Sequence, residues 1–145
     1  MNEKSRSRKE GNNQMERPIR VLIGDDQRVV RMGLRAVLDL ISQVDLVGEA
    51  SNGHESVQLV AERHPDVVLM DLEMPVMDGL EATRRIKSQW PEVKVIALTM
   101  DAAYRARALG AGADAFLIKG CTADDLQAAI TQAPDAAPHR RAMRA

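Results

Sequence analysis

Five side chains that could bind a metal ion or a phosphoryl group stand at or just beyond the ends of short apolar runs. They are Asp25, Asp26, Asp71, Thr99 and Lys119. Carboxylates are the ligands that Mg²⁺ prefers, and a carboxylate can also attack phosphorus. A hydroxyl and an ammonium can bind phosphoryl oxygens. These residue types together predict phosphoryl chemistry, provided that the fold brings them to one place.

The elements that must position these residues alternate regularly along the chain. Short apolar runs predict strands at 19–24, 44–50, 66–70, 93–99 and 114–119. Helical periodicity predicts helices at 27–41, 54–63, 79–89, about 102–110, and 122–132. In the last of these, Thr122 and Asp125 have the spacing of a capping box.

Strands that alternate with helices predict an α/β fold. The strands lack polar alternation, which indicates a parallel sheet covered on both faces. Right-handed crossovers then give a doubly wound, five-stranded parallel sheet in the order 2-1-3-4-5 with five helices, a flavodoxin-like architecture. In such a sheet the carboxyl ends of strands 1, 3, 4 and 5 lie at one edge, so the five side chains are expected to meet there.

Each of these residues also has an ordinary structural explanation. Asp26 could cap the first helix, Lys119 could extend from a strand end to solvent, and Thr99 could belong to a simple turn. Their convergence on one edge favours a site over a series of unrelated turns. Clustered carboxylates repel one another unless a cation offsets them, so we expect Mg²⁺ as the cofactor and Asp71 as the nucleophile.

Length and charge predict one domain between two tails. The 145 residues are 45% hydrophobic and 28% charged, typical of one globular domain. Residues 1–18 are expected to form a basic flexible tail, 19–133 the domain, and 134–145 a tail or linker remnant. Residues 21–133 hold 11 Lys/Arg and 17 Asp/Glu, a net charge of −6, so we expect no direct nucleic-acid binding by the body of the domain.

The cellular setting is predicted from cysteine content and apolar runs. Cys121 is the single cysteine, which fits a cytoplasmic protein without disulfides. No apolar run approaches the roughly 20 residues of a membrane span, and the N-terminus has no secretory apolar region. We expect neither membrane insertion nor secretion.

Several motifs together resemble the receiver domain of two-component response regulators. They are DD (25–26), DLEMPVMDG (71–79), LT (98–99) and GADAFLIK (112–119). Each motif is weak alone, but their order on these elements is specific. Further stretches, among them GEASNG (48–53), are most similar to the NarL/FixJ (LuxR-type) subfamily.

The resemblance implies a role for each matching residue. Asp71 would accept a phosphoryl group from a sensor histidine kinase, and Asp25 or Asp26, with Asp71 and the backbone carbonyl of Glu73, would hold Mg²⁺. Thr99 and Lys119 would bind the phosphoryl oxygens, and Phe116 would act with Thr99 as the switch. The chain would catalyse only its own phosphorylation and dephosphorylation, and so is not expected to be an enzyme with an external substrate.

The partners implied are the kinase and, on phosphorylation, a second copy of the chain. We expect the kinase to dock at the acidic pocket and at the first helix, where Arg28, Arg31 and Arg35 are expected to face solvent. The output would be transcriptional regulation through a DNA-binding domain. Only about a dozen residues follow the last predicted helix, too few for such a domain.

Other functions stay open at this point. The chain could be a free-standing receiver, or a pseudo-receiver that acts by protein–protein contact alone. A phosphatase of the haloacid dehalogenase type also uses an aspartate nucleophile after a strand. Such an enzyme needs a second aspartate, as general acid, at the position where this chain has Glu73. A flavodoxin-like nucleotide binder lacks support because no phosphate-binding loop is evident.

Overall fold

A computed structural model of the chain describes residues 17–132, and the sheet has the predicted order β2-β1-β3-β4-β5 with every strand pair parallel. The strands are β1 (Ile19–Gly24), β2 (Val44–Ala50), β3 (Val67–Asp71), β4 (Lys94–Thr99) and β5 (Ala115–Ile118). The predicted tails, 1–18 and 134–145, lie outside this range except for residues 17 and 18.

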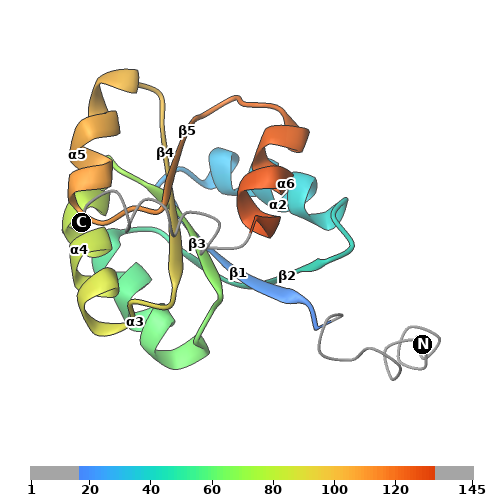
Figure 1. Cartoon of the computed structure of the whole chain (residues 1–145), viewed down its shortest axis with the longest axis horizontal. Helices are drawn as coiled ribbons and strands as arrows, with labels where there is room; N and C mark the ends of the chain where they lie inside the picture. Colours follow the sequence, from blue (N-terminus) through green and yellow to red (C-terminus); the bar gives the residue numbers. More distant parts are fainter. Residues whose placement is uncertain (1–16, 133–145) are drawn as a thin grey trace, which may run out of the picture.

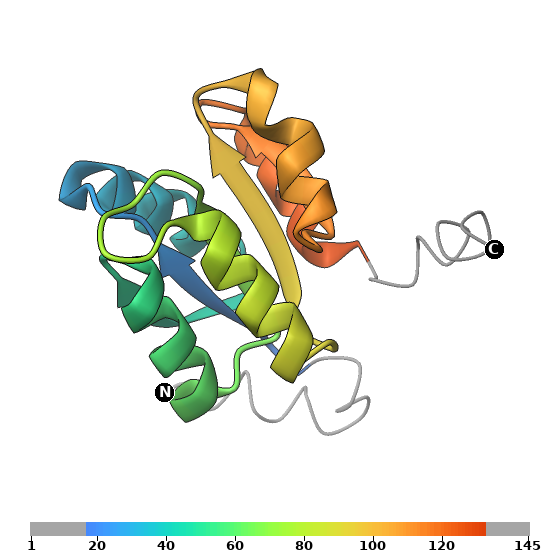
Figure 2. The same cartoon turned by 90° about the vertical axis from the view of Figure 1, so that its left-hand side faces the viewer.

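Helices cover both faces of the sheet (Figure 1). They are α2 (Arg28–Asp39), α3 (Gly53–Arg63), α4 (Gly79–Gln89), α5 (Arg105–Gly110) and α6 (Ala123–Thr131), with a 3₁₀ turn, η2 (Ala102–Tyr104), before α5. α3, α4 and α5 lie on one side, and α2 and α6 on the other, as the turned view also shows (Figure 2). The doubly wound α/β fold is therefore confirmed for the described residues.

The strands that carry the site are the most buried parts of the fold. Every residue of β3 and β4 is buried, as are the last four residues of β1. Two apolar clusters form the core: one lies under α3, α4 and α5 and includes Met70 and Ile86, and the other lies under α2 and α6 and includes Leu69 and Leu126. The central strand ends are therefore held from both faces, which fixes the side chains that follow them.

One predicted strand has different bounds, and one predicted helix keeps its bounds but is divided. The predicted strand 66–70 instead runs from Val67 to Asp71, so Asp71 is still paired in the sheet, opposite Leu98. The predicted helix near 102–110 is divided between η2 and α5. Asp101 fixes the start of the segment, because its carboxylate accepts a hydrogen bond from the Ala103 amide (2.9 Å) and caps η2.

A buried lysine fixes the end of α6 where β4 begins, at the end of the sheet opposite the five side chains. Lys94, at the start of β4, donates its ammonium protons to the backbone carbonyls of Ala129 and Gln132. Burial lowers the pKa of this lysine, and the charge of Asp114 opposes that effect. The two carbonyls belong to the last turn of the helix, where backbone acceptors lack helical partners. Lys94 thereby satisfies its own buried charge and anchors α6.

None of the helices in the described range combines the length and the apolarity that a bilayer-spanning segment needs.

The start of α4 is pressed against the end of β3. A methyl group on Gly79 would lie 2.0 Å from the carbonyl oxygen of Asp71 and 2.7 Å from the Cα of Leu72. Backbone atoms cannot move aside as a flexible side chain can. The glycine is therefore required by the close approach of two backbone segments rather than by its φ angle.

Gly79→Ala is expected to lower the free energy of unfolding by about 2 kcal/mol or more, because it forces β3 and α4 apart. Gly33→Ala is the matched control: it lies in the middle of α2 with no atom within 4 Å of the added methyl group. That substitution is expected to raise the free energy of unfolding by about 0.5 to 1 kcal/mol through helix propensity. Urea unfolding of both variants measures these changes. Equal changes in the free energy of unfolding would contradict the packing described.

Candidate functional site

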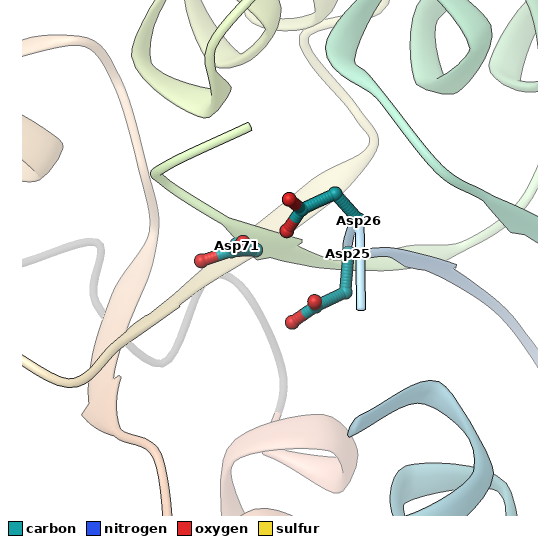
Figure 3. Close-up of side chains that lie close together, drawn as sticks. All are labelled: Asp25, Asp26 and Asp71. Carbon is teal, nitrogen blue, oxygen red and sulfur yellow. The ribbon is translucent and has the colours of Figure 1, made fainter. Parts of the chain in front are cut away.

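Three carboxylates gather where β1 and β3 end. Gly24 and Met70 are aligned partners in these neighbouring parallel strands, and the residues that follow them are Asp25 and Asp71. Oxygen atoms of Asp25, Asp26 and Asp71 all lie within 4.8 Å of one another (Figure 3). Asp25 and Asp71 are buried, whereas Asp26 is exposed. The cluster thus has a buried floor and one carboxylate open to solvent.

Lys119 supplies the positive charge to this cluster. Its Nζ lies 2.7 Å from Oδ2 of Asp25 and 3.1 Å from Oδ1 of Asp71. Burial alone would lower the pKa of the ammonium, but the hydrogen bond to Asp25 and the charges of both aspartates outweigh burial and raise it. Lys119 is therefore a fixed cation between two buried carboxylates.

The protonation of Asp71 is strongly perturbed by its surroundings. Burial, followed by the charge of Asp25, raises its pKa from 3.8 to about 6, although Lys119 and the backbone N–H of Glu73 oppose the shift. The Glu73 amide donates to Oδ1 at 3.4 Å, a long contact. The carboxylate is thus incompletely compensated, which leaves it receptive to a further cation or an electrophile.

The acidic turn after β1 is fixed by the backbone. The Asp25 amide donates to the carbonyl of Ala50 (3.0 Å), and the amide of Gln27 donates to Oδ1 of Asp25 (2.9 Å). Asp26 was considered as the cap of the first helix. The N-cap is instead Gln27, which makes no capping bond with its side chain. The exposed Asp26 carboxylate therefore stands beside the acidic cluster rather than closing a helix.

Thr99 and Phe116 occupy the neighbouring strands. Thr99 is buried at the end of β4, and its hydroxyl accepts a hydrogen bond from the Asp101 amide (3.3 Å). The Thr99 carbonyl accepts the Lys119 amide (2.8 Å). Phe116 is half-buried in β5, opposite Ala97, and packs against the core on the α3–α5 side. Its switch role stays a prediction.

The Glu73 carboxylate is held by a tyrosine, an arrangement that the sequence alone does not reveal. The side chain of Glu73 is exposed, but it accepts a hydrogen bond from the Tyr104 hydroxyl (2.9 Å). The Arg107 guanidinium lies 4.3 Å from the centre of the Tyr104 ring. These side chains, with Asp26 and Asp78, line a cavity of about 450 Å³ next to the acidic cluster. The bond from Tyr104 accounts for the orientation of the Glu73 side chain. It does not involve the backbone carbonyl of Glu73.

Arg31 was predicted to face solvent with Arg28 and Arg35, and for Arg31 that prediction was wrong. Its side chain is only 18% exposed because it contacts the acidic turn and β2: Nη1 donates to the Asp25 carbonyl (2.8 Å) and Nε to Glu49 (3.2 Å). Helical spacing carries a signal that could have found it, since Arg31 lies three and seven residues before Leu34 and Leu38 on the inner face.

A strained turn lies in the loop between β3 and α4. Val76 has a φ of 69°, in the left-handed region, and the Met77 amide donates to the carbonyl of Pro75 across it (2.7 Å). A β-branched residue is unfavourable in that region. The Val76 side chain is 83% exposed, so packing does not compensate for the strain.

Comparison with known proteins gives a consistent result. A family model for the response regulator receiver domain matches residues 21–131. The transcriptional regulatory protein LnrK of Bacillus subtilis (strain 168) is 43% identical over 114 residues, which are 77% of this chain and 52% of that protein. The response regulator protein VraR of Staphylococcus saprophyticus is 40% identical over 117 residues, 78% of this chain and 55% of VraR. The chain spans about half the length of these relatives.

Solved structures are also similar to this chain. The response regulator domain of Thermotoga maritima CheB superposes with a TM-score of 0.75 at 35% identity, covering 82% of this chain and 98% of that one. The signal receiver domain of NarL from Mycobacterium tuberculosis gives a TM-score of 0.72 at 32% identity, covering 80% and 99%. Sequence and structure therefore agree on the same kind of domain.

Asp71→Asn is expected to raise the free energy of unfolding near pH 7.5 by about 1 to 2 kcal/mol. The pKa of Asp71 is higher in the folded chain, about 6, than its ordinary 3.8. The folded state therefore binds the proton more tightly, and the ionised carboxylate opposes folding above about pH 6. The advantage of the variant should shrink as pH falls from 7 to 5, because the wild type then gains stability by protonation.

Urea unfolding in EDTA across this pH range measures the difference. Asp45→Asn, at an exposed position of β2, is the control and should change little. A difference that does not vary with pH would contradict the raised pKa.

Val76→Gly is expected to raise the free energy of unfolding by about 0.5 to 1 kcal/mol, because glycine adopts a positive φ without strain. Val29→Gly is the matched control, since Val29 is similarly exposed but lies in α2, where glycine should destabilise by about 1 kcal/mol. Thermal or urea unfolding distinguishes the two, and a loss of stability in Val76→Gly would show that the turn is unstrained.

Proposed function

This chain belongs to the response regulator receiver domain family of two-component systems, with LuxR-type regulators among its relatives, and from that premise we propose that it is a phosphorylation-dependent switch in which Asp71 accepts the phosphoryl group. The donor is a sensor histidine kinase, the kind of protein with which receiver domains interact. The observation that carries the proposal is the placement of Lys119 between Asp25 and Asp71 (2.7 and 3.1 Å).

The chemistry proposed for Asp71 is nucleophilic attack. One ionised carboxylate oxygen attacks the phosphorus of a phosphohistidine and forms a new P–O bond. The P–N bond breaks, and its electron pair remains on the imidazole nitrogen. The Lys119 ammonium and the Thr99 hydroxyl would bind oxygens of the transferred group as charge spreads over them. Hydrolysis of the aspartyl phosphate later restores the carboxylate.

We also propose that the acidic cluster holds Mg²⁺. The fit rests on the donor set: three carboxylates with oxygens within 4.8 Å, one of them exposed, and an Asp71 pKa raised by burial and then by the charge of Asp25. Asp25, Asp26 and Asp71 would be the side-chain ligands, with the backbone carbonyl of Glu73. When bound, the ion supplies positive charge against the phosphoryl oxygens.

The switch is proposed to connect Thr99 with Phe116. Their strands are adjacent, and Phe116 is half-buried rather than locked in the core. A Thr99 drawn toward a phosphoryl group would vacate space that the aromatic ring can enter. This is the kind of local, two-state change that switching requires.

The proposed output is transcriptional regulation, because one relative bears the name of a transcriptional regulatory protein and the relatives are about twice as long as the matched region. DNA contact would then come from a separate domain. Dimerisation on phosphorylation, action as a free-standing receiver, and a cytoplasmic location stay predictions.

Incubation with acetyl phosphate and Mg²⁺, followed by intact-mass measurement, tests the proposal. Wild type is expected to gain one phosphoryl group, and Asp71→Asn none, because the amide cannot act as the nucleophile. Asp45→Asn is the matched control and should behave as wild type, since Asp45 is exposed on β2. EDTA should abolish the gain. A folded wild type that gains nothing would instead identify a pseudo-receiver that acts by contact alone.

A further inference from the structure

Arg31 connects the acidic turn to the neighbouring strand. Its Nη1 donates to the backbone carbonyl of Asp25 (2.8 Å), and its Nε donates to Oε1 of Glu49 in β2 (3.2 Å). The Arg31 and Glu49 side chains are only 18% and 21% exposed. A planar guanidinium held at two points, in a partly buried place, fixes the groups that it contacts.

The carbonyl that Arg31 holds belongs to the peptide that leads directly into Asp26. Elsewhere the turn is fixed by other bonds: the Asp25 amide to Ala50, the Gln27 amide to Oδ1 of Asp25, and Lys119 at Oδ2. The bond from Arg31 completes this set on the carbonyl side. It therefore sets the plane of the Asp25–Asp26 peptide, and with it the direction in which the exposed Asp26 leaves the backbone.

We propose that Arg31 is a positioning residue for divalent-cation binding at the acidic cluster. It holds the Asp25–Asp26 peptide so that the Asp26 carboxylate joins those of Asp25 and Asp71, and Glu49 holds Arg31 in turn. The inference rests on the proposed Mg²⁺ site and goes beyond it, because Arg31 would act on the metal only through the backbone of its ligands.

Electrostatics alone predicts the opposite change in metal affinity on loss of Arg31, so the direction of the measured change tests the proposal. A guanidinium near a cation site repels the incoming ion, so the loss of its charge should strengthen metal binding. A positioning role predicts weaker binding when the guanidinium is lost, because the carboxylates are no longer held together before the ion arrives. Groups that orient metal ligands typically contribute tenfold or more to affinity.

The same helix offers a matched control. Arg28 is exposed in the first turn of α2 and carries the same charge. Arg35 reaches the other carboxylate oxygen of Glu49 from a side chain that is 57% exposed. Variants of the three arginines thus separate the effects on Mg²⁺ binding of charge, of contact with Glu49 and of contact with the acidic turn.

The test is calorimetric titration of the intact chain with Mg²⁺ alone, with circular dichroism to establish that each variant is folded. Arg31→Met is expected to weaken Mg²⁺ binding by about tenfold. Arg28→Met should leave it unchanged or slightly stronger, and Arg35→Met should have a smaller effect than Arg31→Met. Arg31→Lys keeps the charge and can still donate, but it lacks the planar fork that reaches two acceptors, so it should recover part of the affinity.

A second readout separates positioning from general damage. In acetyl phosphate labelling, Arg31→Met should raise the Mg²⁺ concentration that gives half the maximal rate, with little change in the rate at saturating Mg²⁺. A purely structural role would lower the melting temperature without moving that midpoint.

Several results would overturn the inference. One is Arg31→Met binding Mg²⁺ as tightly as Arg28→Met, or more tightly. If Arg31→Met does not fold, Arg31→Lys decides, and wild-type affinity in that variant would count against a two-point role. If wild type binds no Mg²⁺ in the millimolar range, the proposed metal site fails and this inference falls with it. If wild type binds Mg²⁺ and Arg31→Met binds it equally well, only the inference fails.

Discussion

The ammonium of Lys119, set between Asp25 and Asp71, is the interaction on which this edge of the molecule depends. Two buried carboxylates at the ends of adjacent strands repel each other, and the repulsion is stronger where water is excluded. A single lysine reduces that cost but does not remove it, since burial, followed by the charge of Asp25, still raises the pKa of Asp71. The domain folds with its acidic site assembled in advance, at the expense of some stability.

Much of the fold was predictable because the sheet is buried on both faces. Buried parallel strands require continuous apolar runs, so the strands and their order followed from pattern and handedness alone. The gathering of Asp25, Asp71 and Lys119 followed from the same reasoning, since each ends or follows a strand. The resemblance to response regulator receivers, based on motifs in this order, is confirmed by the family match.

Other features were not predictable because they depend on side-chain geometry between distant segments. Nothing in the local pattern around Glu73 indicates that Tyr104, thirty-one residues later, will hold its carboxylate. Val76 has a positive φ although β-branched residues disfavour it, so residue propensity predicts an extended backbone at this position. Arg31 differs from these, because its spacing from Leu34 and Leu38 indicated the inner face of the helix; only its acceptors, a carbonyl and Glu49 on other elements, could not be predicted.

The backbone bond from the Lys119 amide to the Thr99 carbonyl (2.8 Å) joins two of the strand ends that carry the site. It extends the pairing of β4 with β5 one residue past Ile118, so the hydroxyl and the ammonium are carried on two joined strand ends. β4 is packed on both faces, whereas β5 is the outer strand and Ile118 is 38% exposed. Thr99 and Lys119 therefore stand on unequal supports: the hydroxyl on a strand covered from both faces, and the ammonium just beyond the end of an outer strand.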